Sequence, residues 1–159
     1  MIYLIMGVAG SGKSSIGLNL SKKLLIPFYD ADDYHNIQNI EKMKKGLALN
    51  DSDRKSWLNL LALNMQKWNS EGDAFLACSA LKKKYRLKLS KHNEVTFIFL
   101  NGNYDLIKRR LSKRKNHFFL NAMLQNQFKI LEKPKNCIEI SIDQSIENIC
   151  LSIISKLKK

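Results

Sequence analysis

The sequence has few cysteines and prolines and no long apolar run. Its three cysteines cannot all pair and follow no metal-ligand spacing, which excludes a disulfide framework and a cysteine zinc site. The opening apolar run at residues 2–6 is too short for a secretion signal or a membrane span. We therefore expect a cytoplasmic protein with no membrane partner. Repeats, linkers and low-complexity segments are also missing, which predicts a single domain over residues 1–159.

Acidic residues are scarce as well, because 14 Asp and Glu stand against 27 Lys and Arg, for a formal net charge of +13. Such a charge either attracts anionic partners or reflects a lysine-rich, solvated surface. Arginine supplies little of it, and its planar fork suits phosphate and carboxylate groups, so each arginine is a candidate ligand contact. The arginines are Arg54, Arg86, Arg109, Arg110 and Arg114. No nucleic-acid recognition motif or aromatic–basic alternation is present, so we expect no nucleic-acid partner.

Short apolar runs alternate with stretches of helical periodicity along the chain. Strands are expected at residues 2–6, 27–29, 74–78, 95–100 and 138–142. Helices are expected at residues 14–25, 36–45, 53–70, 82–91, 104–113, 121–132 and 146–157. Alternating strands and helices predict an α/β fold, in which helices flank a parallel sheet and ligands bind at the carboxyl ends of the strands.

A glycine-rich phosphate loop follows the first expected strand and opens the first expected helix. Residues 7–14 read GVAGSGKS and match G-x-x-x-x-G-K-[ST] in this context. Backbone N–H groups of such a loop cradle a triphosphate, while Lys13 reaches the β- and γ-phosphates and Ser14 binds Mg²⁺. The expected nucleotide contacts are Gly7, Val8, Ala9, Gly10, Ser11, Gly12, Lys13, Ser14 and Ser15. The motif predicts nucleotide binding and does not identify the acceptor.

Three carboxylates follow the second expected strand. In an extended segment alternate residues project to the same side, so Asp30 and Asp32 are expected to face the triphosphate, with Asp33 turned away as a helix cap. One carboxylate can order Mg²⁺ through water and the other can accept the acceptor's proton; we place Asp30 with Ser14 at the metal and Asp32 at the proton. The third strand ends in LACS at residues 76–79 without an acidic residue, which favours a small-molecule kinase over motor and AAA-type ATPases.

Further segments accompany the loop MGVAGSGKSS, namely HNIQNIEKMKKG, LNDSDRKSWL, CSALKKKYR and MLQNQFKILEKP. In order and spacing they resemble gluconokinases of the small phosphate-loop type, relatives of shikimate kinase, over residues 2 to about 143. The resemblance implies ATP-dependent phosphorylation of D-gluconate at its terminal hydroxyl to give 6-phosphogluconate, with ATP and Mg²⁺ as cofactors. It also implies a three-layer P-loop kinase fold with a five-stranded parallel sheet, a mobile lid at about residues 112–122, and a homodimer.

The acceptor pocket implied by the resemblance needs a cation for the carboxylate of gluconate and several groups for its hydroxyls. Arg54 is the first choice for the carboxylate and Arg86 the second. His35 and Lys42 are expected at hydroxyl groups, and Asp32 serves as base or substrate anchor. For each basic residue, a surface ion pair is the alternative.

On the donor side, Arg110 and Arg114 stand at the start of the implied lid. Both are expected to contact ATP, and Arg114 is expected to reach the transferring phosphoryl group and neutralise its charge when the lid closes.

Three positions depart from the family pattern, because Ala31 and Asn116 replace usual glycines and Asn36 replaces a usual proline. The methyl group of Ala31 is expected where the substrate approaches. Two alternatives to a gluconokinase stay open. One is a related kinase of shikimate or nucleoside monophosphates, and the other is a nucleic-acid-binding NTPase.

Overall fold

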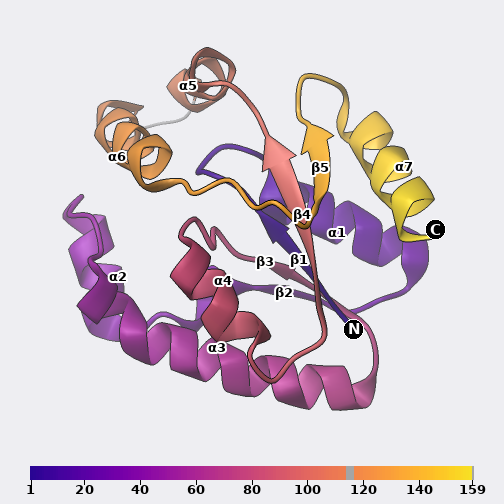
Figure 1. Ribbon diagram of the computed structural model, residues 1–159. Coiled ribbons are helices and arrows are strands. Elements are labelled where there is room, and N and C mark those ends of the chain that lie inside the picture. Colours follow the sequence, from indigo (N-terminus) through magenta and orange to yellow (C-terminus); the bar gives the residue numbers. More distant parts are fainter. Residues whose placement is uncertain (114–116, 159) are drawn as a thin grey trace.

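The computed structural model describes residues 1–113 and 117–158, and of residues 117–121 the backbone alone. Five parallel strands form one sheet in the order β2-β3-β1-β4-β5 (Figure 1). The strands are β1 (Ile2–Met6), β2 (Phe28–Asp30), β3 (Ala74–Ala77), β4 (Val95–Asn101) and β5 (Ile138–Ser141). The predicted five-stranded parallel sheet is confirmed.

The helices follow the expected alternation with the strands. They are α1 (Lys13–Leu24), α2 (Ile37–Lys44), α3 (Asp51–Glu71), α4 (Lys83–Ser90), α5 (Tyr104–Ser112), α6 (His117–Ile130) and α7 (Ile146–Leu157). A short 3-10 helix, η1 (Ala31–Tyr34), follows β2, where the sequence suggested extended chain. Helix α6 begins at His117, inside the segment expected to form the lid.

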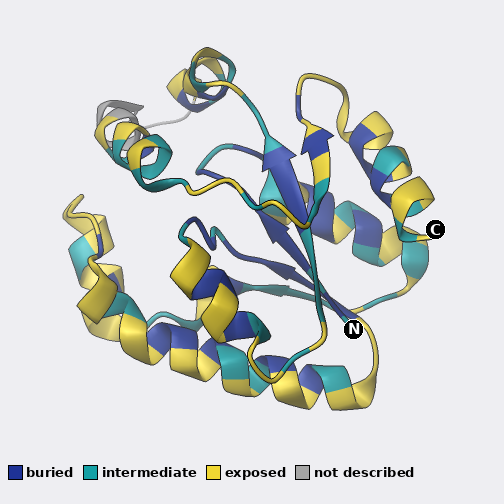
Figure 2. Cartoon of the chain, viewed as in Figure 1, coloured by how far each residue is buried: buried dark blue, intermediate teal, exposed yellow. Residues whose placement is uncertain are grey.

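Helices cover both faces of the sheet and make three layers (Figures 1 and 2). On one face, beside α4, helix α3 buries Trp57, Leu61 and Met65 against alternate side chains of β1 and β3. On the other face, α1, α5 and α7 pack against the remaining strand residues, including Ile5 and Phe75. Because β1 and β3 are covered on both faces, their sequences are continuous apolar runs.

Asparagine and serine side chains fix where several helices begin. Each accepts a hydrogen bond from the backbone N–H three residues on, which satisfies a donor that the helix leaves free. These N-caps are Asn36 for α2, Asn50 for α3, Asn103 for α5 and Ser145 for α7. The sequence placed the start of α3 at residue 53, and in the structure the helix begins at Asp51, with Asn50 as its cap. Among the described helices, none combines the length and the apolar character that crossing a membrane requires.

Candidate active site

A cavity of about 580 Å³ opens at the carboxyl ends of β1, β2 and β3. The loops after these strands emerge at one edge of the sheet because parallel strands all point the same way. Its walls come from the phosphate loop, η1, the α2–α3 connection, the end of β3 and helix α6. Helices α2 and α6, which both contribute lining residues, lie on the same side of the molecule in Figure 1. The sequence predicted a ligand site at this edge.

The phosphate loop curls because its backbone adopts conformations that suit glycine. Gly10 has φ +77°, and a Cβ atom there would stand 2.8 Å from Cγ of Leu111 on α5. Six of the nine residues expected to contact nucleotide line the cavity, namely Ala9, Gly10, Gly12, Lys13, Ser14 and Ser15. Gly7, Val8 and Ser11 are buried and present no side-chain group to the cavity, and the Ser11 N–H donates to Val8 O at 3.2 Å.

Lys13 is folded onto the phosphate loop. Its Nζ donates hydrogen bonds to Gly7 O at 3.1 Å and Val8 O at 3.0 Å. These contacts hold the ammonium group inside the curl of the loop, where a triphosphate would meet it.

Ser14 and Asp30 bring two hard oxygen atoms together. The Ser14 hydroxyl donates to Asp30 Oδ2 at 2.5 Å, joining the start of α1 to the end of β2. Hydroxyl and carboxylate oxygens are ligands that Mg²⁺ accepts when phosphate oxygens and waters complete its shell. The donor set therefore fits the predicted magnesium site. No cluster of three or more His, Cys, Asp and Glu suited to a metal was found among the described residues, so phosphate and water would supply the rest.

The turn that presents Asp32 differs from the extended segment that we expected. Asp30 Oδ1 accepts a hydrogen bond from Asp32 N at 3.1 Å and caps η1, so the chain coils directly after β2. Asp30 and Asp32 still both line the cavity, whereas Asp33 does not. Asp30 and Asp32 thus line the same cavity, as expected, but a capped turn brings them together and not the alternation of side chains along a strand.

Asp32 stands in the cavity with 85% of its side chain exposed. Surrounding protein atoms nevertheless desolvate its carboxyl group in part, and this raises its pKa. The nearby Asp30 carboxylate raises the pKa further, while Lys13 opposes the shift. A raised pKa makes Asp32 a stronger proton acceptor than an ordinary aspartate.

Ala31 faces the core and not the substrate. Its residue is 1% exposed and packs among the side chains of α3, and its carbonyl oxygen accepts from Trp57 Nε1 at 2.8 Å. No positive φ is required of it. The expectation that its methyl group meets the substrate is therefore wrong, and Ala31 gives no reason for an altered substrate preference.

His35 is a neutral donor at the cavity wall. Its ring stacks on Trp57 with centroids 4.4 Å apart, and its side chain is 4% exposed. Burial, aided by the positive charge of Arg54, lowers the pKa of His35 to about 4. Asn39 Nδ2 lies 3.4 Å from Nδ1 and can only donate, which leaves the proton on Nε2. Nε2 lies 3.9 Å from Asp32 Oδ1.

Arg54 lines the same cavity as the phosphate loop. One of its nitrogens donates to Leu49 O, and its guanidinium carbon lies 5.7 Å from the centroid of the Tyr85 ring. These contacts hold the planar group in place and leave further N–H donors for a ligand. The structure thus brings Arg54 together with His35 and Asp32, as predicted for an acceptor pocket.

Other predicted substrate residues lie outside the cavity lining. Arg86 is 7% exposed and donates to Ala80 O at 2.9 Å and Leu81 O at 3.0 Å, so it braces the loop after β3 instead of contacting substrate. Ala80 needs this support because its φ is +43°. Lys42 pairs with Asp53 at 2.6 Å, at the N-terminus of α3.

The predicted lid arginines are not brought to the phosphate loop by the described structure. Arg110 donates to Ile142 O at 2.6 Å, just beyond β5, and does not line the cavity. Arg114 lies outside the described residues, as does Asn116.

Helix α6 adds cavity residues that the sequence analysis left unassigned. Gln127 Oε1 accepts from Ala9 N at 2.6 Å, and Asn126 and Met123 line the same wall. A signal for them was present in the sequence: Asn126 and Gln127 are adjacent amides in the segment MLQNQFKILEKP, within the helix expected at residues 121–132.

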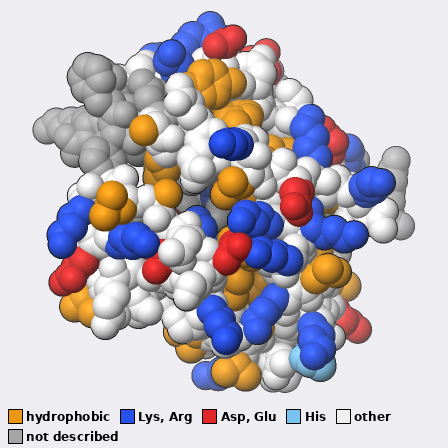
Figure 3. Space-filling model, turned by 60° about the vertical axis from the view of Figure 1, so that its left-hand side comes forward, with side chains coloured by type: hydrophobic (Ala, Val, Ile, Leu, Met, Phe, Trp, Pro, Cys, Tyr) orange, Lys and Arg blue, Asp and Glu red, His pale blue; other side chains and the backbone are white. Residues whose placement is uncertain are grey.

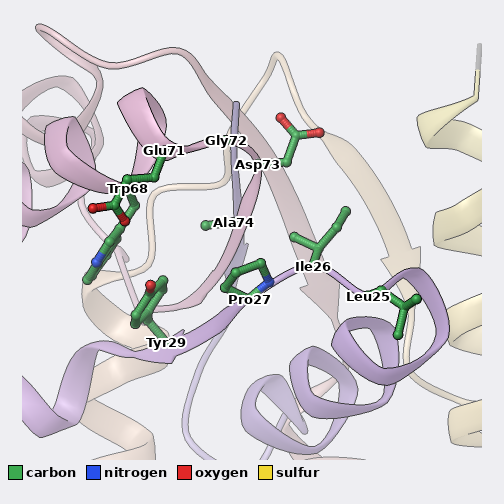
Figure 4. A pocket seen from close by; sticks show the side chains of 9 residues that line it. All are labelled: Leu25, Ile26, Pro27, Tyr29, Trp68, Glu71, Gly72, Asp73 and Ala74. Atoms are coloured by element: carbon green, nitrogen blue, oxygen red, sulfur yellow. The ribbon is translucent and has the colours of Figure 1, made fainter.

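A second hollow, of about 240 Å³, lies at the opposite edge of the sheet beside Pro27 and Ala74 (Figure 4). Trp68 stacks on Tyr29 in its wall, with ring centroids 3.9 Å apart. It sits at the amino ends of β2 and β3, away from the phosphate loop, so the larger cavity is the candidate active site.

Known proteins match this chain over nearly its whole length. The family model for shikimate kinase matches residues 9–157. The thermoresistant gluconokinase of Escherichia coli is 43% identical over 99% of this chain and 94% of its own length. A gluconokinase structure from Sinorhizobium meliloti is similar with TM-score 0.88 at 32% identity, over 98% of this chain and 90% of that chain. Shikimate kinase from Aquifex aeolicus shares the fold, with TM-score 0.62 at 19% identity over 99% and 96% of the two chains. This chain therefore belongs to the gluconokinases, within the shikimate kinase family.

Proposed function

We propose that the protein phosphorylates D-gluconate with ATP, giving 6-phospho-D-gluconate. One observation carries the proposal: Asp32, His35 and Arg54 stand in the same cavity as the phosphate loop. Phosphorylation of a small hydroxy acid needs three kinds of group: a carboxylate that can take a proton, a neutral hydrogen-bond donor for hydroxyls, and a guanidinium held in place for the substrate's carboxylate. The gluconokinase relatives support this choice of acceptor.

The donor half of the reaction is assigned to the loop and β2. Lys13 would stabilise the negative charge on the β- and γ-phosphates, and the loop N–H groups would orient them. Ser14 and Asp30 would hold Mg²⁺, which when bound supplies positive charge to the phosphate oxygens. Arg114 is proposed to join from the lid, at about residues 112–122.

The acceptor half uses the raised pKa of Asp32. Its carboxylate would take the proton of the terminal hydroxyl as that oxygen attacks the γ-phosphorus and the bond to the β-phosphate oxygen breaks. Arg54 would bind the gluconate carboxylate with two N–H donors. His35 would donate a hydrogen bond from Nε2–H to a substrate hydroxyl, because a neutral imidazole ring keeps one N–H donor.

Two further properties are proposed at the level of the whole protein. A cytoplasmic location is supported by the three free cysteines, which suit a reducing compartment. A homodimer through α3 is supported by Leu60 and Leu63, which are 44% and 63% exposed on that helix.

A substrate panel tests the proposed function. ADP release would be measured with ATP and Mg²⁺ in the presence of gluconate, glucose, shikimate, nucleoside monophosphates or RNA. We expect turnover with gluconate and little with glucose, which has the same carbon chain length but no carboxylate for Arg54. Turnover with shikimate or RNA and none with gluconate would contradict the proposal.

A further inference from the structure

One side chain of α6 reaches across to the phosphate loop. Gln127 Oε1 accepts the backbone N–H of Ala9 at 2.6 Å. The amide atom that faces an N–H must be the oxygen, so this contact sets the orientation of the whole amide group. The carbonyl of the same Val8–Ala9 peptide unit accepts from Lys13 Nζ at 3.0 Å. A single peptide unit therefore joins Gln127 to the lysine of the phosphate loop.

Core packing of side chains next to Gln127 holds helix α6 at this position. Leu124 is fully buried in the core, and the Phe128 ring lies 5.5 Å from that of Tyr104 on α5. These two anchored side chains fix the rotation of the helix about its axis, and in this rotation Met123 and Gln127, which lie one turn apart, both line the cavity. The contact with Ala9 thus comes from a helix that is packed independently of it.

The second amide atom of Gln127, Nε2, is turned away from Ala9. Within the part of the chain that the structure describes, no hydrogen bond occupies Nε2, and Gln127 lines the cavity with Lys13 and Asp32. An amide NH₂ group carries two donors and no charge. A nucleotide bound at a phosphate loop places its phosphate oxygens, which accept hydrogen bonds, in the adjoining cavity.

We propose that Gln127 is a further catalytic residue, whose Nε2 donates a hydrogen bond to the terminal phosphate of bound ATP while its Oε1 holds the loop at Ala9. The proposal rests on the proposed function in one respect, since it takes the cavity to be the donor site of a kinase. Because ADP lacks the terminal phosphate, this contact discriminates the triphosphate from the diphosphate.

Two substitutions separate the two ends of the amide. Gln127→Glu has nearly the same shape and keeps an oxygen for Ala9, but replaces the NH₂ donor with an anionic oxygen. Gln127→Leu removes both ends. Gln125→Glu is the matched control, because Gln125 is exposed on the same helix and the substitution adds the same negative charge to it.

The measurement is the dissociation constant of ATP and of ADP, by calorimetry with Mg²⁺ and without an acceptor. We expect Gln127→Glu to weaken ATP about tenfold or more, as for a lost hydrogen bond to a charged group, and ADP by much less. Gln127→Leu should weaken ATP less than Gln127→Glu does, and Gln125→Glu should change neither constant.

Equal weakening of ATP and ADP by Gln127→Glu would overturn the proposal, as would a Gln127→Glu protein that binds ATP like the wild type. If thermal melting shows Gln127→Glu to be unfolded, the same comparison of the dissociation constants of ATP and ADP is made with Gln127→Asn. Because no acceptor is present, a failure here is distinct from a failure of gluconate turnover, which would contradict the proposed function instead.

Discussion

His35 makes the stability of the protein depend on pH at the level of one residue. Its folded pKa of about 4 lies below its ordinary value of 6.5, so the unfolded chain binds more protons between these values. Stability contributed by neutral His35 is therefore lost as pH falls from about 6.5 toward about 4. We predict that the wild type loses about 1–2 kcal/mol from this residue between pH 7 and pH 5.

Urea denaturation at both pH values measures this loss. In His35→Gln the difference between pH 7 and pH 5 should shrink by that amount, because the titrating ring is gone. His92→Gln, which removes an exposed imidazole, is the control and should keep the wild-type difference. An undiminished difference in His35→Gln would show that the ring does not titrate in this way.

Asp32 carries the predicted proton transfer. We predict that Asp32→Asn lowers kcat for gluconate by about 10²–10⁴, the usual contribution of a general base. In the wild type, the fall of kcat toward acid pH should begin above the range of an ordinary aspartate, because the pKa of Asp32 is raised and its carboxylate is the active form. Steady-state kinetics across pH checks both.

Asp33→Asn is the matched control, since Asp33 is exposed, adjoins Asp32 and does not line the cavity. It should keep a near-normal kcat. A fully active Asp32→Asn would remove Asp32 from the role of base, and a change in KM without a change in kcat would make it a substrate anchor.

At this scale the sequence could predict residues whose role follows from local pattern. The phosphate-loop motif placed Lys13 and Ser14, and the acidic turn placed Asp30 and Asp32 in one cavity. Arg86 could not be placed in this way, because the carbonyl groups that it braces belong to a loop whose fold the sequence does not display. Gln127 was missed for a related reason, since its partner Ala9 is 118 residues away.

Among the helices, α3 depends on its N-terminal cap to present Arg54. Asn50 and Asp53 form a capping box, in which each side chain accepts the backbone N–H of the other at 2.8 Å. We predict that Asn50→Ala lowers the free energy of unfolding by about 1 kcal/mol, as for other lost N-caps. It should also raise KM for gluconate, because Leu49 O orients Arg54 from the adjoining residue.

Urea denaturation and steady-state kinetics measure these two effects. Asn59→Ala, an exposed change within α3, should leave KM unchanged and should not lower the free energy of unfolding, since alanine is a better helix former than asparagine. An Asn50→Ala protein as stable as Asn59→Ala would contradict the importance of the cap.

Periodicity predicted the strands and most helices closely, because buried parallel strands and amphipathic helices leave clear patterns. It failed where a side chain redirects the backbone. Asp30 bonds back to Asp32 N and coils the chain into η1, which strand alternation does not anticipate. Periodicity also set the start of α6 too late, at residue 121 instead of His117.

For the whole molecule, the proposed homodimer makes a testable claim about α3. We predict that the protein sediments at about twice its chain mass of 18.4 kDa. Replacing Leu60 and Leu63 together with serine should give a folded monomer, because both side chains are exposed in the single chain and contribute apolar area to a partner. Sedimentation velocity checks the masses.

Leu151→Ser is the control for the dimer, since Leu151 is 52% exposed on α7, in the other layer of helices. It should leave the mass unchanged. A wild type that stays monomeric at assay concentrations would contradict the dimer.

Positive charge is not concentrated in one patch on the face of the molecule that Figure 3 shows. Figure 3 shows Lys and Arg side chains spread over this face among acidic and apolar side chains. Some cations of the chain have local partners, since Lys82 and Lys84 both form ion pairs with Asp51. Such a face agrees with the interpretation of the net charge as a solvated surface.

The most direct test of the account is the ³¹P NMR spectrum of the products formed from ATP, Mg²⁺ and D-gluconate. Transfer to the terminal hydroxyl predicts a new phosphate ester signal, split by the two protons of one CH₂ group and equal in amount to the ADP formed. Release of inorganic phosphate without an ester, or an ester on another carbon of gluconate, would contradict the placement of Asp32, His35 and Arg54 in a gluconate site.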